Sequence, residues 1–446
     1  MQNTTADIDW SEVSEQATDL LREYIRIDTT NPPGGEEAGA DLLRRELARE
    51  GIDSRYHDAG DGRVSISARL PATEGGGGKP IVLLSHIDVV PAEPEHWRVD
   101  PFSGDLVDDV IWGRGALDMK GMGIMELMVL ALAKRHGLAL KNDLVFLAVA
   151  DEEAGGEKGV RFLQEAAPEL FDASLVVNEG AYGFSQFFGQ DVTMFGVCPS
   201  EKSPCWVTLR AEGAPGHASV PHADNAVARL VKALGKIESH EQSARITEPV
   251  RAMFRTLMAR GLVPADLDLE DPETIEAVAS IDAHVSAITR DTINLTGLTA
   301  GSKHNVIPAG AEATLDCRLL PDTDPDRFVE QLREIIDDPK VEIRRVLEHY
   351  SGQSSLDTPF TKTIAEVVAE RYGEAGHVVP MLSPGFTDSH AFRAAGVESY
   401  GFTPALLTRE ELSTIHGHNE RISRTNLRLG TEILYDVIGR LASRGC

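Results

Sequence analysis

The 446-residue sequence has few cysteines, few lysines and no long hydrophobic run. Its four cysteines, Cys198, Cys205, Cys317 and Cys446, are too few and too irregularly spaced for a disulfide framework or a thiolate metal site. No window reaches the run of about eighteen apolar residues that a membrane span requires. The polar, acidic stretch 1–9 contains no hydrophobic segment of the kind found in secretion signals. We therefore expect a reduced, soluble, cytoplasmic protein.

Positive charge is also scarce. The 71 Asp and Glu outnumber the 43 Lys and Arg, for a formal net charge of −28 at pH 7, and only 11 of the basic residues are lysine. Such a field repels phosphate backbones and anionic membranes, which disfavours nucleic acids and membrane surfaces as partners. Acid excess with so little lysine indicates a halophilic protein, because molar salt screens the self-repulsion. An ordinary acidic enzyme is the alternative interpretation.

The composition is that of a globular protein, with 42% hydrophobic and 26% charged residues. The length predicts two or three domains. Short, nearly continuous apolar runs occur at 81–84, 144–150 and 175–177, and helical patterns such as 122–135 separate them. This arrangement is typical of buried parallel strands in an α/β sheet.

From about residue 200 the pattern changes to that of a second domain. Alternating segments predict strands, and amphipathic segments predict helices, in the order strand 205–211, helix 225–237, strands 292–298 and 311–319, helix 324–336 and strand 341–347. This β-α-β-β-α-β order fits a ferredoxin-like α+β domain, with an extra helical insert at about 240–290. We predict an α/β domain with a mostly parallel sheet at 1–199 and 353–446, and an inserted domain at 200–352.

Side chains that can bind metals follow each predicted buried strand. The three strands end in Ser85-His86-Ile87-Asp88, Asp151-Glu152-Glu153 and Asn178-Glu179. Open α/β sheets place their sites at this carboxyl edge. Asp118 lies in a glycine-bounded turn before a helix, and His416 opens the segment His-Gly-His-Asn-Glu. One such residue alone is usually a cap or a turn. Five that converge on one sheet edge indicate a site.

The residue types select the metal and the chemistry. Two imidazoles and three carboxylates without a thiolate suit zinc, or cobalt or manganese, and are enough for two ions with one bridging carboxylate. His86 and Asp88 point to the same side of a strand, so Asp88 can accept the free imidazole N–H. The adjacent Glu152 and Glu153 point in different directions, so one can bind metal while the other moves a proton. This layout is typical of a metal-dependent hydrolase.

Together with Gly216-His217-Ala218-Ser219, these segments resemble the zinc metallopeptidase family that contains acetylornithine deacetylase, succinyl-diaminopimelate desuccinylase, aminoacylase and glutamate carboxypeptidase. The resemblance covers nearly the whole chain. It implies a zinc-peptidase-like catalytic domain, an inserted lid or dimerisation domain, two Zn²⁺ ions with Co²⁺ or Mn²⁺ as possible substitutes, and a homodimer. It also implies a cis peptide bond between Asp118 and Met119.

The resemblance also implies a role for each candidate residue. His86 and Glu179 would bind one zinc, Glu153 and His416 the other, and Asp118 would bridge them. Three residues would act in catalysis. Glu152 would be the general base, assisted by Asp88, and His217 would stabilise the oxyanion, often from the partner subunit. Asn305 and Arg318 would hold the carboxylate of the substrate. His304 and His418, which neighbour these candidates, are left outside the metal site.

We predict hydrolysis of an amide next to a free carboxylate, either in an N-acyl amino acid or at the end of a small peptide. The alternative within enzymes is desuccinylation or deacetylation in lysine or arginine synthesis. The alternative outside enzymes is a metal-binding partner subunit without catalysis, against which Glu152 argues. A serine hydrolase is disfavoured because the sequence has no Gly-x-Ser-x-Gly turn. A solvated loop residue remains the alternative for His217, and a solvated strand residue for Arg318.

Overall fold

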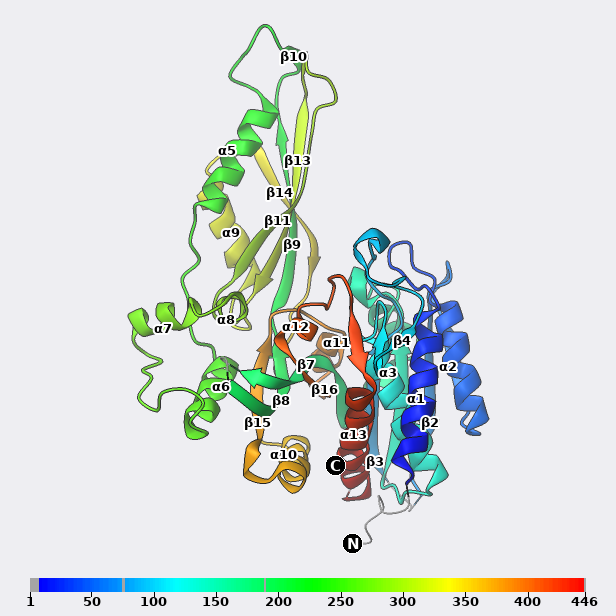
Figure 1. Cartoon of the computed structure of the whole chain (residues 1–446). Helices are drawn as coiled ribbons and strands as arrows, with labels where there is room; N and C mark the ends of the chain where they lie inside the picture. Colours follow the sequence, from blue (N-terminus) through cyan, green and yellow to red (C-terminus); the bar gives the residue numbers. More distant parts are fainter. Residues whose placement is uncertain (1–7, 74–76, 188–189, 445–446) are drawn as a thin grey trace. The chain divides into compact units, whose positions relative to one another are not determined.

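The computed structural model describes residues 8–73, 77–187 and 190–444 of the chain (Figure 1). Residues 1–7, which carried much of the interpretation of the N-terminus, lie outside this range. The chain divides into two compact units. The first unit consists of Met1–Pro199, Gln353–Met381 and Thr387–Cys446, and the second of Ser200–Gly352 with Leu382–Phe386. The lid and dimerisation roles of the inserted domain stay predictions.

An eight-stranded sheet forms the centre of the first unit, in the order β1-β2-β6-β3-β7-β16-β8-β15. Its strands are β1 (Ser54–Asp58), β2 (Val64–Leu70), β3 (Gly78–His86), β6 (Asn142–Val149), β7 (Leu175–Phe187), β8 (Gln190–Glu201), β15 (Gly376–Ser383) and β16 (Glu398–Leu407). The central strands β6, β3, β7 and β16 run parallel, and β2 and β8 join them antiparallel. The predicted α/β class and parallel centre are confirmed, and the edges add antiparallel pairs.

Both faces of the central sheet are buried, which explains the continuous apolar runs in the sequence. Alternate residues of β3 belong to different clusters of the core. Ile81 and Leu83 pack in one cluster with residues of α1, α3 and α13. Val82 and Leu84 pack in another cluster with residues of α4 and α11. The sheet is therefore the middle layer of three.

The helices of the first unit cover these two faces. They are α1 (Trp10–Ile25), α2 (Glu37–Arg49), α3 (Lys120–Arg135), α4 (Val160–Ala166), α10 (Pro359–Tyr372), α11 (Ser389–Ala394), α12 (Arg409–Leu412) and α13 (Arg424–Arg444). Helix α13 packs against α1, α3 and α10. Helix α3 is buried from Lys120 through Ala133, which accounts for its almost wholly apolar sequence. It starts directly after a cis peptide bond between Asp118 and Met119, as the resemblance implied.

The second unit contains a four-stranded antiparallel sheet in the order β11-β13-β9-β14. Its elements are β9 (Ser203–Glu212), α5 (Ala226–Glu238), β11 (Thr292–Ala300), β13 (Gly310–Leu319), α9 (Pro325–Ile336) and β14 (Val341–Glu348). One apolar cluster joins the sheet to α5 and α9. The expected helical insert contains α6 (Glu248–Ala259), α7 (Pro272–Ala279) and α8 (Ala283–Thr289). A two-stranded ribbon pairs β10 (Gly216–His217) with β12 (Val306–Ile307).

A small three-stranded sheet in the first unit, ordered β17-β5-β4, anchors two loops. It consists of β4 (Asp105–Val107), β5 (Val110–Trp112) and β17 (Arg421–Ser423). The glycine-rich segment 113–121 leaves from β5, and the segment 416–420 leads into β17. Because β5 and β17 are neighbours, these two segments start from adjacent positions.

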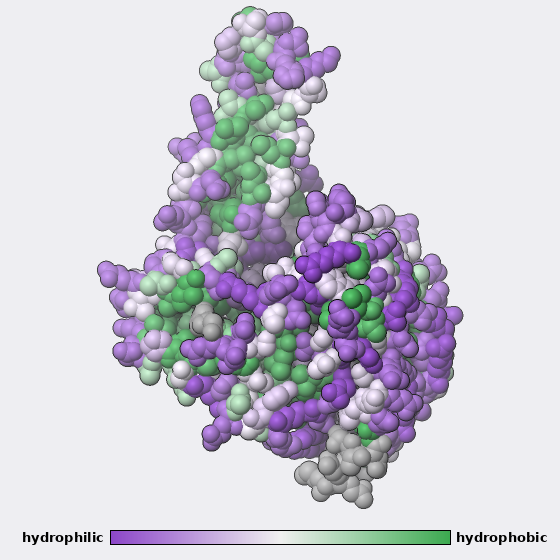
Figure 2. Space-filling model, viewed as in Figure 1, coloured by the Kyte–Doolittle hydropathy of each residue, from purple (hydrophilic) through white to green (hydrophobic). Residues whose placement is uncertain are grey.

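Hydrophilic side chains cover much of the surface in the view of Figure 2, as the acid-rich composition predicts. None of the helices within residues 8–73, 77–187 and 190–444 has the length and apolar character to cross a membrane.

Candidate active site

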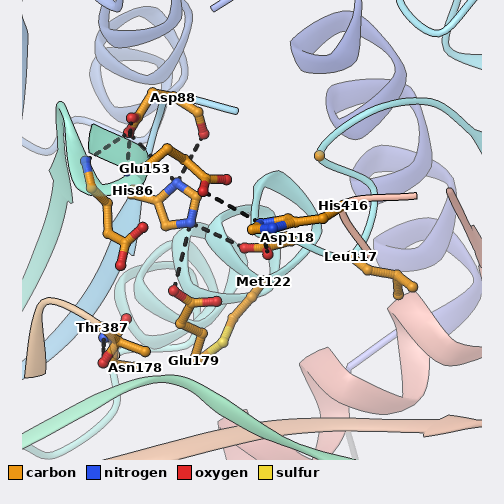
Figure 3. Close-up of polar contacts among 12 residues, drawn as sticks. His86, Asp88, Leu117, Asp118, Met122, Glu153, Asn178, Glu179, Thr387 and His416 are labelled. Atoms are coloured by element: carbon orange, nitrogen blue, oxygen red, sulfur yellow. Dashed lines mark hydrogen bonds and ion pairs between the residues drawn. The ribbon is translucent and has the colours of Figure 1, made fainter. Parts of the chain in front are cut away.

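Three adjacent parallel strands bring the first group of candidate residues together. His86 is the last residue of β3, and Glu179 lies in β7. The third strand, β6, leads into Asp151 and a 3-10 turn, η2 (Glu152–Ala154). Since β3 is the neighbour of both β6 and β7, the side chains meet at one edge of the sheet (Figure 3).

Asp118 lies between two imidazoles (Figure 3). Its Oδ1 is 3.1 Å from Nε2 of His86, and its Oδ2 is 3.0 Å from Nε2 of His416. Each oxygen of one carboxylate thus faces a different histidine. This is the arrangement that a carboxylate bridging two ions requires.

A further carboxylate lies beside each of the two histidines. Oε1 of Glu179 lies 3.6 Å from Nε2 of His86, and Oε2 of Glu153 lies 3.3 Å from Nε2 of His416. The potential ligand atoms of His86, Asp118 and Glu153 all lie within 4.8 Å of one another, as do those of His86, Glu152 and Glu179. The distances pair His86 with Glu179 and His416 with Glu153.

The electrostatics of the cluster fit divalent cations. Burial raises the pKa of the Glu152, Glu153 and Glu179 carboxyl groups. Burial alone lowers the pKa of an imidazole, but hydrogen bonds to Asp118 and neighbouring carboxylates raise that of His416 to about 11. Oε1 of Glu153 is buried and has no hydrogen-bond partner among the described residues. Buried carboxylates of this kind ionise readily only beside a cation, and nitrogen and oxygen donors without thiolate suit zinc, cobalt or manganese.

The structure corrects one expectation about Asp88. Nδ1 of His86 lies 2.8 Å from the backbone oxygen of Asp88 and 3.7 Å from its carboxylate Oδ1, so the backbone carbonyl makes the hydrogen bond. The carboxylate instead accepts the backbone N–H groups of Glu152 and Glu153, at 3.1 Å each. These amide donors draw the carboxylate away from the imidazole. Asp88 therefore holds the turn that presents both glutamates.

A polar network that no sequence pattern indicated lies beneath this turn. Asn31 donates to Asp88 at 2.8 Å and to Asp151 at 3.1 Å. Arg63 donates to Asn31 at 2.8 Å and lies 2.6 Å from Glu36. The only local signal was the turn Asn31-Pro32-Pro33-Gly34, which contains two cis X-Pro bonds. Nothing in the local pattern indicated that this turn reaches the strand ends.

Arg114 and Glu420, which lie in the segments of Asp118 and His416, are two further residues that the sequence patterns did not indicate. Their side chains form a buried ion pair of 2.7 Å behind the turn that carries Asp118. The spacing of charged residues within a segment does not reveal a partner 306 positions away.

The second unit carries the other candidates. His217 is an exposed residue of β10, and its Nδ1 lies 2.7 Å from Oγ of Ser219. Asn305 immediately precedes β12, and its backbone oxygen accepts the N–H of Ala218 at 3.1 Å. The β10–β12 ribbon therefore brings His217 and Asn305 together.

Arg318 lies in β13, in the four-stranded sheet rather than in the ribbon. Its Nε and Nη2 donate to the carboxylate of Asp316 at 2.7 and 3.0 Å. Its guanidinium lies over the rings of Phe386 and Trp206, at 4.7 and 5.8 Å from their centroids. An internal carboxylate thus already occupies one edge of this guanidinium.

The two histidines left outside the site are His304 of the second unit and His418 of the first. His304 is exposed, and Nε2 of His418 lies 3.8 Å from Glu93. Neither belongs to a group of potential metal ligands within the described residues.

Comparison with known proteins gives the family. Residues 82–440 match the model of peptidase family M20/M25/M40. The chain is 30% identical over 371 residues to the N-fatty-acyl-amino acid synthase/hydrolase PM20D1 of Xenopus tropicalis, covering 80% of this chain and 72% of that protein. It is 28% identical over 432 residues to aminoacylase-1 of Sus scrofa, covering 95% of each chain.

Solved structures share the fold. An M20 family metallo-carboxypeptidase, Sso-CP2 from Sulfolobus solfataricus, superposes with a TM-score of 0.74 at 21% identity, covering 96% of this chain and 100% of that one. A dinuclear metal binding M20 peptidase, YXEP of Bacillus subtilis, superposes with a TM-score of 0.59 at 16% identity, covering 97% and 99% of the two chains. The family match spans most of the sequence, including every residue of the clustered site, and the chain therefore belongs to peptidase family M20/M25/M40.

Proposed function

We propose that this protein is a dinuclear metal-dependent amidohydrolase. It cleaves an amide next to a free carboxylate, as an N-acyl-amino acid deacylase or a small-peptide carboxypeptidase. One observation carries the proposal: the two oxygens of Asp118 face two different imidazoles, each beside a further buried carboxylate. The relatives support the reaction, since they include an aminoacylase, an N-fatty-acyl-amino acid synthase/hydrolase and a metallo-carboxypeptidase.

His86 and Glu179 hold one ion in this proposal, and His416 and Glu153 hold the other, with Asp118 between them. Zinc is the proposed metal, because both imidazoles and carboxylates bind it well, and cobalt or manganese can replace it. When bound, such ions polarise a carbonyl group and lower the pKa of water.

Glu152 moves the protons of the reaction. It accepts a proton from the attacking water, whose oxygen bonds to the amide carbon, and returns that proton to the amine nitrogen as the C–N bond breaks. The second proton of the water also leaves the new carboxyl group, so the products are a carboxylate and a protonated amine. The hydrogen bonds from the Glu152 and Glu153 amides to Asp88 keep both side chains in fixed directions.

The second unit recognises the substrate in this proposal. The Arg318 guanidinium binds the substrate carboxylate with the edge that Asp316 leaves free, and Asn305 assists. His217 stabilises the oxyanion that develops on the amide carbonyl. The His217→Ala variant should lose kcat while its metal content stays that of the wild type.

The test pairs metal analysis with substrate assays. Protein purified in molar KCl is measured for metal content, and hydrolysis is followed over N-acyl amino acids, N-succinyl-diaminopimelate, N-acetylornithine and dipeptides. We expect two ions per chain. Glu152→Gln should lower kcat by about 10²–10⁴-fold and retain the metal. Glu157→Gln is the matched control, because that glutamate lies nearby with a 76% exposed side chain.

Several outcomes would contradict the proposal. Fewer than two ions in the wild type would refute the dinuclear site, and full activity of Glu152→Gln would refute the proton transfer. Two ions without hydrolysis of any substrate would favour a non-catalytic partner subunit. Activity confined to the succinyl or acetyl precursors would assign the enzyme to amino-acid biosynthesis.

A homodimer formed through β11 belongs to the same proposal. This strand is at the edge of the four-stranded sheet, and its Leu295 and Leu298 are 49% and 54% exposed. An edge strand with exposed leucines is a template for pairing with a second copy. Light scattering should give the mass of a dimer for the wild type and of a monomer for Leu298→Lys.

We also propose that the enzyme works in high salt. Its formal net charge is −28, and the acidic side chains repel one another unless salt screens them. Hydrolysis should be faster in roughly 2 M KCl than in dilute buffer. A higher rate in dilute buffer would leave the acidic composition as that of an ordinary enzyme.

A further inference from the structure

A buried ion pair lies behind the candidate metal site. Nη1 of Arg114 and Oε2 of Glu420 are 2.7 Å apart, and their side chains are 2% and 0% exposed. Arg114 belongs to the segment that leads to Asp118, and Glu420 to the segment that starts at His416. The pair therefore joins the two loops that carry these two candidate ligands.

The side chain of Glu420 binds the backbone of the loop that carries Asp118. Its Oε1 accepts the N–H groups of Leu117 and Asp118 at 2.7 and 3.0 Å. Its Oε2 accepts the N–H of Gly115 at 3.1 Å in addition to Arg114. One carboxylate thus satisfies three backbone donors and a guanidinium, and every one of them belongs to the segment that presents Asp118.

Arg114 holds the opposite loop. Its Nη2 donates to the backbone oxygen of Gly417 at 2.9 Å, directly after His416. His416 and Asn419 have φ angles of 57° and 64°, in the left-handed region that non-glycine residues rarely adopt. A turn of this conformation depends on contacts with its surroundings, and Arg114 supplies one of them.

The neighbouring strands β5 and β17 already bring the two loops together where the loops start. Arg421 of β17 lies opposite Trp112 of β5, and the N–H of Gly113 donates to the backbone oxygen of Glu420 at 2.9 Å. The two loops leave the small sheet side by side, and the ion pair fixes them again close to the ligands. Figure 3 shows the result, with His416 and Asp118 facing each other.

We infer that Arg114 and Glu420 are positioning residues that set the spacing of Asp118 and His416, and so determine the affinity of the metal position formed by Asp118, Glu153 and His416. This inference rests on the proposed function. The other position shares Asp118 but takes its remaining ligands from His86 and Glu179, which the strands β3 and β7 hold directly. Loss of the ion pair should therefore weaken the position that contains His416 more than the position that contains His86.

The test is a titration of the metal-free full-length chain with Co²⁺, followed by calorimetry and by visible absorption. The wild type should bind two equivalents. Glu420→Gln should bind the second equivalent about tenfold or more weakly than the wild type does, with a smaller loss for the first. Glu432→Gln is the control, because it breaks a part-buried ion pair between Glu432 of α13 and Arg371 of α10, neither of which is a candidate ligand. It should leave both equivalents unchanged.

Arg114→Lys is the second variant, because it keeps the positive charge while a single ammonium cannot bridge both Glu420 and Gly417. It should show the same selective weakening, and it tests the inference if Glu420→Gln does not fold. Equal weakening of both equivalents, or no weakening in either variant, would overturn the inference. A wild type that binds fewer than two equivalents would instead overturn the proposed function.

Discussion

The two units bury charge in opposite ways. The first unit gathers the carboxylates of Asp118, Glu152 and Glu179 at one sheet edge, where desolvation raises the pKa of both glutamates. The second unit builds its core from apolar residues of β9, β13, α5 and α9. Buried carboxylates without a cation destabilise a fold, whereas apolar burial stabilises it. The first unit therefore gives up stability for a binding site, while the second depends on packing.

The units also share one device. Each buries a lysine that donates to backbone oxygens at the C-terminal end of a helix, where carbonyl groups lack partners. Lys120 donates to the oxygens of Tyr24, in the last turn of α1, and of Ile27, just after it, at 3.1 and 2.7 Å. Lys202 donates to the oxygens of Ala287, in the last turn of α8, and of Arg290, just after it, at 2.9 Å each. Burial lowers the pKa of both lysines to about 7.

Metal removal should have the largest effect, and only on the first unit. Ligands that bind the folded state stabilise it by about 4 kcal/mol at a free concentration a thousand times Kd. Chelation should therefore increase hydrogen exchange in peptides around His86 and Glu152, measured by mass spectrometry on the full chain. Peptides of α9 serve as the internal control. Equal increases in both units would show that the metal stabilises the second unit as much as the first.

A core substitution in the second unit should have the next largest effect. Leu332 in α9 is fully buried, so Leu332→Ala should lower the free energy of unfolding of this unit by about 3 kcal/mol. Val346→Ala, at a position 63% exposed, should change it by less than about 0.5 kcal/mol. Denaturant unfolding measures both. The metal content of Leu332→Ala should equal that of the wild type, and a lower content would show that the site depends on this packing.

The buried lysine of the second unit should make its stability depend on pH. Because the pKa of Lys202 is about 7 in the folded chain and near 10.5 in the unfolded one, the unfolded state binds more protons between these values. Stability therefore rises with pH across this window, by about 2 kcal/mol from pH 7.5 to 9. Lys202→Met should remove this rise, measured as the difference in unfolding free energy from the wild type.

The exposed Lys362→Met is the control for that slope, since Lys362 is 65% exposed and pairs with Asp357. Its unfolding free energy should follow the wild-type pH dependence. An unchanged slope in Lys202→Met would show that Lys202 stays protonated at the helix end.

The smallest effect should come from a surface ion pair of the second unit. Arg345 pairs with Asp326, whose side chain is 86% exposed, and with Glu348. Arg345→Ala should lower the unfolding free energy by less than about 1 kcal/mol, and molar salt should reduce the difference further. A loss above about 2 kcal/mol would mean that the second unit, like the first, depends on its charged groups.

The sequence by itself determined the α/β class and which residues end the central strands. The runs at 81–84 and 144–150 are apolar at successive positions because β3 and β6 are buried on both faces. Parallel strands bring their carboxyl ends to one edge, so His86, Glu152 and Glu179 could be grouped without coordinates. The motifs around Asp118 and His416 indicated the family, because each motif is short and can be read within one segment of the sequence.

Only the tertiary structure decided which groups hold these residues in place. Asn31 reaches Asp88 across 57 positions, and Arg114 reaches Glu420 across 306. The carboxylate of Asp88 accepts amide N–H groups rather than the imidazole of His86, because the η2 turn folds over it. Periodicity in a sequence reports burial along one element. The partner of a buried charge depends instead on which loops meet, and that is determined by the packing of the whole unit.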